Sequence, residues 1–153
     1  MTTTSFKRIV IGTNAAGKSV VESTSAVPIV EFEPAGGPGG EMVWAADVWI
    51  TPRAHPTVNE GPVEREWELE PPEGGTVWRV VYFPAHSQGT ELHKTQTIDV
   101  ALVLHGRVWC VLEEGGIEVG PGDWVVQRGT VHAWDNRYDE GCLMAVALVS
   151  ARA

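Results

Sequence analysis

Residues 93–106 read HKTQTIDVALVLHG, and residues 121–136 read PGDWVVQRGTVHAWDN. The first stretch places His93 before the carboxylate of Asp99, and the second places His132 after a proline-glycine turn and a short apolar run. Both apolar runs are rich in β-branched residues, which is typical of strands bounded by turns. The two stretches therefore predict paired strands that carry two histidines and a carboxylate.

The rest of the chain shows the same alternation of short apolar runs and turn-forming residues. Gly, Pro, Asn or Asp interrupts the sequence every eight to twelve residues, and short β-branched or aromatic runs fill the intervals. This pattern is typical of an all-β sandwich or barrel. The expected strands are Lys7–Ile11, Lys18–Val21, Ile29–Phe32, Met42–Ile50, Thr76–Phe83, Thr97–His105, Arg107–Glu113, Ile117–Val119, Asp123–Gln127 and Leu143–Val149.

The two opening stretches resemble the two-motif signature of the cupin family. The matching residues are His93, Gly106, Gly129, His132 and Asn136, with Asp99 at the position of the usual glutamate. Thr95 stands where the family has a second histidine, so one of its four usual metal ligands is missing. The resemblance implies a single cupin or jelly-roll β-barrel with extra N-terminal strands. Residues 76–150 would form the cupin core, and residues 1–75 would complete the barrel or a dimer as part of one domain.

Length and charge limit the function classes. A chain of 153 residues is long enough for one domain with a sizeable core. Its formal net charge of −9 argues against nucleic acid and anionic membrane surfaces as partners. The N-terminus lacks the apolar core of a secretory signal, and Cys110 and Cys142 lie in apolar contexts that favour reduced thiols. We expect a cytoplasmic protein.

Residues 12–19, GTNAAGKS, match the phosphate-binding P-loop pattern. A P-loop requires a helix directly after its lysine and serine, so that the helix N-terminus faces the phosphates. The chain instead continues with a strand-like run toward Pro28. We therefore interpret this segment as a hairpin turn.

His93, Asp99 and His132 form the expected catalytic centre. The resemblance places His132 on a neighbouring strand and points it into the same cavity. Two imidazoles and a carboxylate can bind Fe, Mn, Ni or Zn, with His86 as a candidate fourth ligand. Without a metal, Asp99 would orient one histidine for proton transfer and His132 would act as the complementary acid. Both alternatives, one divalent metal or none, stay open.

Several other side chains are candidates for substrate binding. Arg79 could hold a carboxylate or carbonyl of the substrate, or form a salt bridge within the protein. The remaining candidates are Trp78, Tyr82, Thr95, Trp109 and Trp134. His105 and His55 are expected to lie away from the site, and the acidic stretch from Glu60 to Glu73 reads as a solvated loop or edge strand.

The strand Thr97–His105 indicates a partner. If Asp99 points inward, alternation turns four aliphatic side chains outward, and such a stripe is rarely left in water. The strand Leu143–Val149 is apolar on both faces. We expect N-terminal strands or a second subunit to cover this surface, and hence a homodimer.

These observations favour a small-molecule enzyme. The resemblance implies dehydratases, decarboxylases, isomerases and dioxygenases of secondary and aromatic metabolism. Our first hypothesis is a lyase or isomerase that uses His/Asp acid–base chemistry on an apolar, carbonyl-bearing metabolite. The alternatives are an iron-dependent dioxygenase and a non-catalytic ligand-binding cupin.

Overall fold

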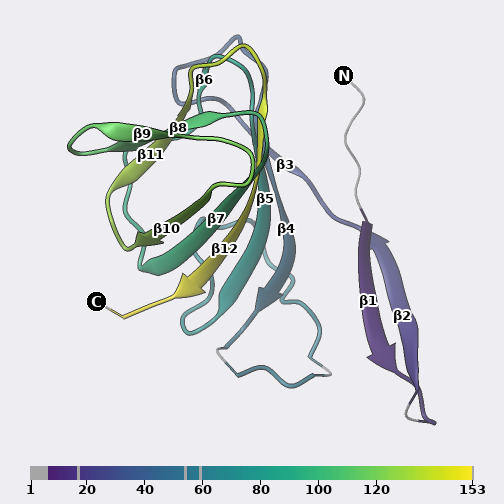
Figure 1. Cartoon of the computed structure of the whole chain (residues 1–153). Helices are drawn as coiled ribbons and strands as arrows, with labels where there is room; N and C mark the ends of the chain where they lie inside the picture. The colour runs from purple at the N-terminus through teal and green to yellow at the C-terminus, as the bar shows by residue number, and fades with distance from the viewer. Residues whose placement is uncertain (1–6, 17, 54, 59, 153) are drawn as a thin grey trace.

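The computed structural model describes residues 7–16, 18–53, 55–58 and 60–152, and these contain strands and loops (Figure 1). The strands are β1 (Lys7–Thr13), β2 (Ser19–Ala26), β3 (Val30–Phe32), β4 (Val43–Thr51), β5 (Thr76–Phe83), β6 (Ser87–Gln88), β7 (Thr97–His105), β8 (Val108–Leu112), β9 (Gly116–Val119), β10 (Trp124–Arg128), β11 (His132–Asn136) and β12 (Cys142–Ser150). The expected strands are all present, with ends that differ by a few residues. The short strands β6 and β11 were not predicted. No helix in the described part is long and apolar enough to cross a bilayer.

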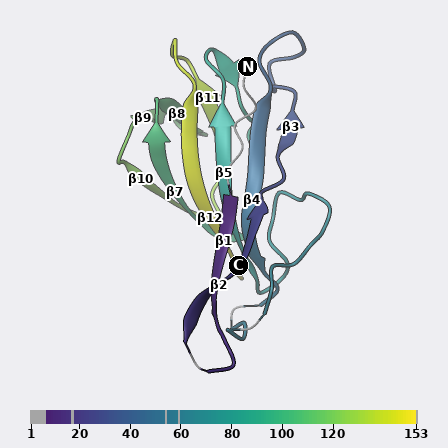
Figure 2. The ribbon, with the colours of Figure 1, turned by 90° about the vertical axis from the view of Figure 1, so that its right-hand side faces the viewer.

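Two sheets face each other to form an open jelly-roll sandwich (Figures 1 and 2). One has six strands in the order β10-β7-β12-β5-β4-β3, and the other has four in the order β6-β11-β8-β9. All strand pairs are antiparallel. The prediction of an all-β, jelly-roll fold is confirmed, although the two sheets do not join into a closed barrel across the described strands.

The hydrophobic core lies between the sheets. Alternate residues of β7 and β12 point inward, and Val103 and Met144 are almost fully buried there. Trp134 of β11 and Val108 of β8 close the core from the four-stranded sheet. Cys110 and Cys142 are buried in the same core as free cysteines, as the sequence predicts.

Two motif residues are explained by backbone geometry. Gly106 has φ of +70°, and a Cβ there would lie 2.2 Å from the carbonyl oxygen of Gly141. Only glycine fits such a turn. Asn136 is buried, and its side-chain amide donates to the carbonyls of Phe83 (3.0 Å) and Glu140 (2.8 Å). Asn136 therefore closes the end of the sandwich through these two hydrogen bonds.

The four strands before β5 belong to two different parts of the structure. β4 pairs with β5, and β3 pairs with β4, so these strands extend the six-stranded sheet. β1 and β2 instead form a separate hairpin that projects from the body (Figure 1). Its turn is held by Asn14, whose side chain accepts from the amides of Ala16 and Lys18. The P-loop pattern thus belongs to a hairpin turn, although Gly17 lies outside the described residues.

Candidate functional site

A cavity of about 400 Å³ opens between the two sheets. This volume is within the range of small-molecule sites, roughly 300–1,000 Å³. Its wall is mainly apolar, with Phe32, Val81, Phe83, Trp134 and Met144 among the lining residues. The polar groups that reach it are few, and they include His93, His132 and Asp99. The sequence correctly predicted that these three share one cavity.

The two histidines lie side by side at the cavity wall. His93 and His132 exchange main-chain hydrogen bonds of 2.9 and 3.0 Å, and their ring centroids are 4.5 Å apart. Each Nδ1 lies against a main-chain carbonyl, that of Glu91 (2.8 Å) for His93 and that of Thr130 (2.9 Å) for His132. A carbonyl oxygen only accepts, so each Nδ1 carries the hydrogen and each Nε2 keeps its lone pair in the neutral ring.

This arrangement corrects two expectations about the histidines. The rings are oriented by main-chain carbonyls in place of the carboxylate of Asp99. His132 is also better suited as a base than as the complementary acid. Burial lowers the pKa of His132, and the neighbouring His93 lowers it further, while the bond to Thr130 and the charge of Asp99 oppose this.

Asp99 projects from β7 into the same cavity and is buried. Burial raises the pKa of Asp99, while the Thr97 hydroxyl and the charges of His132, His93 and Arg79 act against this rise. Its Oδ1 has no hydrogen-bond partner among the described residues. A carboxyl group in this setting holds its proton more readily than an exposed aspartate, and can serve as an acid.

The expected metal ligands do not assemble. In the described part of the chain, no three His, Cys, Asp or Glu side chains come together as a metal site requires. The two imidazoles adjoin, but Asp99 does not complete a three-ligand set with them. His86 is exposed, and its Nε2 pairs with Asp139 at 2.7 Å outside the cavity, so it does not replace the missing ligand. Of the two alternatives, one divalent metal or none, the donors as arranged in the described residues do not fit the metal.

Arg79 forms a salt bridge within the protein. Its Nε lies 2.6 Å from Oδ1 of Asp47 and its Nη2 lies 3.1 Å from Oδ2. The guanidinium also donates to the carbonyls of Glu68 and Leu69 and lies 4.8 Å from the ring centroid of Trp67. Although Arg79 lines the cavity, four of its five N–H donors bind Asp47, Glu68 and Leu69, which disfavours the role of a substrate clamp.

The aromatic candidates separate by strand face. Trp134 lines the cavity, as expected. Trp78 is largely exposed on the opposite face of β5, and Tyr82 on that face stacks on Trp44 with centroids 5.7 Å apart. Trp109 packs under Arg137 on the outside of β8. Of the candidates for substrate binding, Trp78, Tyr82 and Trp109 therefore do not line this cavity, and on β5 the alternating pair Arg79 and Phe83 does.

The polar candidates are placed more simply. Thr95 lines the cavity, and its hydroxyl is buried against that of Thr97 at 2.7 Å. His105 and His55 are exposed away from the cavity, in agreement with the prediction.

Gln127 was not predicted as a site residue. It is buried in the cavity wall opposite Asp99 in the β10–β7 register, and its amide lies 3.8 Å from Sγ of Cys110. Alternation along β10 separates it from the exposed Trp124 and Val126, and this signal could have identified it.

The acidic stretch contributes a wall of the cavity. Trp67 and Leu69 line it, and Trp67 packs on Phe32 with centroids 4.6 Å apart. Residues 60–73 were interpreted as a solvated loop or edge strand; they form a loop, but Trp67 and Leu69 face the cavity instead of solvent. The signal was present, because residues 64–70 read EREWELE, in which glutamates alternate with Arg65, Trp67 and Leu69.

Comparison with known proteins confirms the fold. A cupin-2 domain protein of Rhodospirillum rubrum superimposes with a TM-score of 0.54 at 15% identity, over 83% of this chain and 72% of that one. A cupin 2 conserved barrel domain protein of Rhodopseudomonas palustris gives 0.54 at 13% identity, over 94% and 82%. The polyketide cyclase RemF of Streptomyces resistomycificus gives 0.51 at 18% identity, over 72% and 66%. The chain has the cupin fold.

Sequence comparison gives a shorter match. Two proteins of Diaporthe leptostromiformis, the phomopsin biosynthesis cluster proteins C′ and D, are each 40% identical over 65 residues. The match covers 42% of this chain and 34% of each relative, so the chain matches about a third of their length. No protein-family model matches the chain.

Proposed function

We propose that this cupin-fold chain is a small-molecule lyase or isomerase that moves protons on a neutral, apolar, carbonyl-bearing metabolite. The observation that carries the proposal is the cavity itself, in which two adjoining imidazoles and a buried carboxyl face an apolar wall. Groups of different proton affinity in one mainly apolar cavity are suited to acid–base catalysis.

The similar proteins support a substrate from secondary metabolism. One structure of the same fold is a polyketide cyclase, and the two matching sequences belong to a phomopsin biosynthesis cluster. Dehydration and cyclisation of a ketone can both begin with removal of a proton beside the carbonyl group, whereas decarboxylation reaches an enolate by loss of carbon dioxide. A fold does not determine a reaction, so the choice among these reactions has to be argued from the residues of the site.

The site suggests the role of each residue. Nδ1 of His132 donates to the carbonyl of Thr130, and burial lowers the pKa of the ring, which favours its neutral form. The lone pair on Nε2 can then accept the proton from the carbon next to the carbonyl. The bonding electrons of that C–H bond form the enolate. For a dehydration, the carboxyl of Asp99 donates its proton to the leaving hydroxyl. The C–O bond breaks, its electrons leave with the oxygen as water, and the enolate electrons form the new C=C bond. The proton held by His132 then restores the acid, which leaves the enzyme unchanged.

The charges around the cavity favour an uncharged substrate. Asp47 and two main-chain carbonyls occupy the guanidinium of Arg79, and acidic side chains such as Glu33 and Glu91 lie at the wall. A substrate carboxylate would meet acidic groups without a free cation to pair with. We therefore expect ketones to bind better than the corresponding keto acids.

Hydrogen exchange of a simple ketone tests the proposal without knowledge of the natural substrate. The α-protons of 1-tetralone exchange in D₂O at a rate that proton NMR measures directly. We expect the wild type to accelerate this exchange about tenfold or more over His132→Gln, because general acid–base catalysis contributes at least this much. His105→Gln is the matched control, since His105 is exposed outside the cavity.

Two results would contradict the proposal. Saturable displacement of the neutral fluorophore 1-aminoanthracene by 1-tetralone, with equal exchange in all variants, would indicate a ligand-binding cupin. Exchange or oxygen uptake that stops with EDTA and returns with Fe(II) would indicate a metal-dependent enzyme, in particular a dioxygenase. Metal analysis of the purified wild type and His132→Gln accompanies both measurements.

A further inference from the structure

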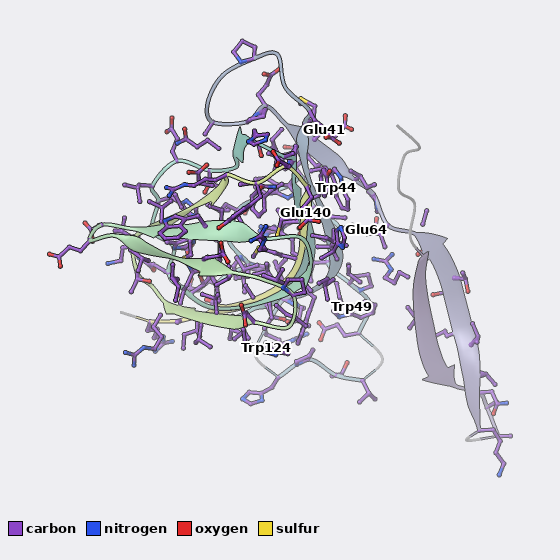
Figure 3. All side chains as sticks on the ribbon, turned by 45° about the horizontal axis from the view of Figure 1, so that its top comes forward. Glu41, Trp44, Trp49, Glu64, Trp124 and Glu140 are labelled. Carbon is purple, nitrogen blue, oxygen red and sulfur yellow. The ribbon has the colours of Figure 1, made fainter. Side chains whose placement is uncertain are left out.

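Gln127 places a buried carboxamide in the cavity wall. Alternation along β10 points Trp124 and Val126 outward, where they are 65% and 60% exposed, and Figure 3 shows Trp124 at the margin of the sandwich. Gln127 takes an inward position, is only 6% exposed and lines the cavity. The strand therefore holds a polar group inside a wall that is mainly apolar.

The hydrogen bonds of this carboxamide are incomplete. Its Nε2 lies 3.8 Å from Sγ of Cys110, and its oxygen has no hydrogen-bond partner among the described residues. Burial raises the pKa of the Cys110 thiol, although the Gln127 amide opposes this rise, so the sulfur stays protonated at neutral pH. A thiol sulfur is a weak acceptor. Since buried polar groups are almost always paired, an amide with one weak partner can bind a ligand without breaking a strong bond.

The place of Gln127 beside the acid–base residues indicates what it would bind. Gln127 and Asp99 lie directly opposite each other in the β10–β7 register, which brings the two Cβ atoms to about 4.5–5.5 Å. Among the described residues, no hydrogen bond joins their side chains, and Oδ1 of Asp99 has no partner. Both groups share the cavity with His93 and His132. A substrate carbonyl held for proton transfer would therefore lie within reach of the carboxamide.

A carbonyl oxygen needs a hydrogen-bond donor, and the other polar groups of the site have few to offer. The Nδ1–H of His93 and that of His132 are occupied by main-chain carbonyls, which leaves only acceptors on the neutral rings. Four of the five donors of Arg79 are also occupied. The single proton of the Asp99 carboxyl is assigned to the leaving hydroxyl. The carboxamide of Gln127 has two N–H donors and one weak partner, so it is the best suited of these groups to bind the carbonyl.

We propose that the Gln127 carboxamide donates a hydrogen bond to the carbonyl oxygen of the substrate and to the enolate oxygen that replaces it. The inference rests on the proposed function. When Nε2 of His132 takes the proton, the electrons of the C–H bond form a carbon–carbon double bond, and the π electrons of the carbonyl move to its oxygen. A donor already placed at this oxygen stabilises the charge as it develops. Because the bond to sulfur is weak, the amide loses little when it turns to the substrate.

The carbonyl stretch of a bound ketone tests the inference directly. 1-Tetralone labelled with carbon-13 at the carbonyl gives an infrared band that moves to lower wavenumber when the oxygen accepts a hydrogen bond. We expect this band, in the wild-type complex, to lie below its position in hexane and to move back toward it in Gln127→Met, which keeps the length of the side chain without a donor. Gln96→Met is the matched control, since Gln96 is exposed outside the cavity, and its band should equal that of the wild type.

Affinity and stability separate substrate binding from a structural role. Displacement of 1-aminoanthracene should show that Gln127→Met binds 1-tetralone roughly two- to tenfold more weakly, which corresponds to one hydrogen bond, while the hydrocarbon tetralin binds no more weakly. The Tm of Gln127→Met should not fall, because the substitution removes an incompletely paired amide. A lower Tm with an unchanged band would assign Gln127 a structural role and overturn the inference. If Gln127→Met does not fold, Gln127→Leu replaces it with the same expectations for the band and the affinities.

Hydrogen exchange of 1-tetralone distinguishes this inference from the proposed function. If both hold, exchange should fall about tenfold or more in Gln127→Met, since loss of one donor to a developing oxyanion slows catalysis by at least this much. A band that depends on Gln127, without exchange in any variant, would support the carbonyl contact and contradict the proposed function. Exchange that depends on His132, with the same band in the wild type and in Gln127→Met, would overturn the contact and leave the proposed function.

Two further outcomes would also overturn the inference. The indole nitrogen of Trp67, a residue that lines the cavity, has no hydrogen-bond partner among the described residues. A band that moves in Trp67→Phe and not in Gln127→Met would assign the carbonyl contact to Trp67. Failure of the wild type to bind 1-tetralone at millimolar concentration would contradict both the contact and the proposed function.

Discussion

Asp99 is a residue at which stability and function are expected to conflict. Its carboxyl is buried, and Oδ1 has no hydrogen-bond partner among the described residues. Replacement by asparagine keeps the shape and removes the charge. We expect Asp99→Asn to be more stable than the wild type at pH 8 by about 1 kcal/mol, the low end for a buried polar group because the cavity opens to solvent. This corresponds to roughly 2–4 °C in Tm.

The pH dependence of this gain follows from the pKa of Asp99. Burial raises the pKa above the value of about 3.9 in an unfolded chain, so folding favours the protonated carboxyl. The contribution to stability is complete below the unfolded value and is lost as the pH rises through the folded value. The advantage of Asp99→Asn in thermal melts should therefore vanish near pH 4 and grow toward pH 8. A variant less stable than the wild type at pH 8 would show that the charge has a stabilising partner.

The sequence predicts the identity of the central residues better than their interactions. His93, His132 and Asp99 were recognisable because family spacing and strand alternation both placed them on one inner face. The main-chain carbonyls of Glu91 and Thr130 orient the two rings. Their role could not be predicted, because a main-chain carbonyl is present at every residue and gives no signal in the sequence. The pairing of His86 with the Asp139 carboxylate was not predicted for a different reason, because that partner lies 53 residues away in the sequence.

Arg79 and Asp47 anchor the segment that forms one wall of the cavity. The pair joins β5 to β4, and the same guanidinium holds the carbonyls of Glu68 and Leu69. We expect Arg79→Met to lower the free energy of unfolding by about 3–5 kcal/mol, because it leaves the carboxylate of Asp47 largely buried and unpaired. The double variant Asp47→Leu/Arg79→Met should recover part of this loss, since the two carbonyls still lack their donors. Urea denaturation measures both.

The exposed pair of Arg53 and Glu60 provides the control for this experiment. Its donor–acceptor distance is also 2.6 Å, but the side chain of Arg53 is 63% exposed. Arg53→Met should leave the unfolding midpoint unchanged, because solvent screens an exposed pair. Equal effects of Arg53→Met and Arg79→Met would contradict an anchoring role for Arg79.

At the level of elements, periodicity predicts strands but not always which face is buried. β5 is apolar on both faces, so its alternation could not decide between Trp78 and Arg79 for the cavity. β11 escaped prediction because five residues that include His132, Asp135 and Asn136 do not form an apolar run. The segment 64–70, which contains Trp67, was not recognised as part of the cavity wall. Its glutamates dominate the composition, although Trp67 and Leu69, which alternate with them, face the cavity.

At the scale of the whole molecule, the sequence predicts the β-sandwich but not the direction in which the β1–β2 hairpin projects from it. Turn spacing and the two motifs specify the jelly roll, because each strand buries its inner face against the other sheet. The position of the β1–β2 hairpin relative to the sandwich is not specified in this way. Its two strands pair with each other, and they join the sandwich through contacts such as those of Arg8. Local sequence therefore predicts the hairpin but does not predict its direction.

The charge of the chain makes the homodimer expected from the sequence testable by salt. Each copy carries a formal net charge of −9, so the long-range force between copies is repulsive. The exposed apolar side chains of Trp124 and Val126 on the outward side of β10 are the contact we expect between copies. Salt shortens the Debye length from about 20 Å at 20 mM to about 4 Å at 500 mM. We expect the dissociation constant of the dimer to fall several-fold over this range of NaCl, measured by sedimentation equilibrium, while Trp124→Glu, which places a charge in this apolar contact, stays monomeric throughout. A dissociation constant that rises with salt would show that ion pairs hold the copies together, and would assign the interface to a charged surface instead of this apolar one.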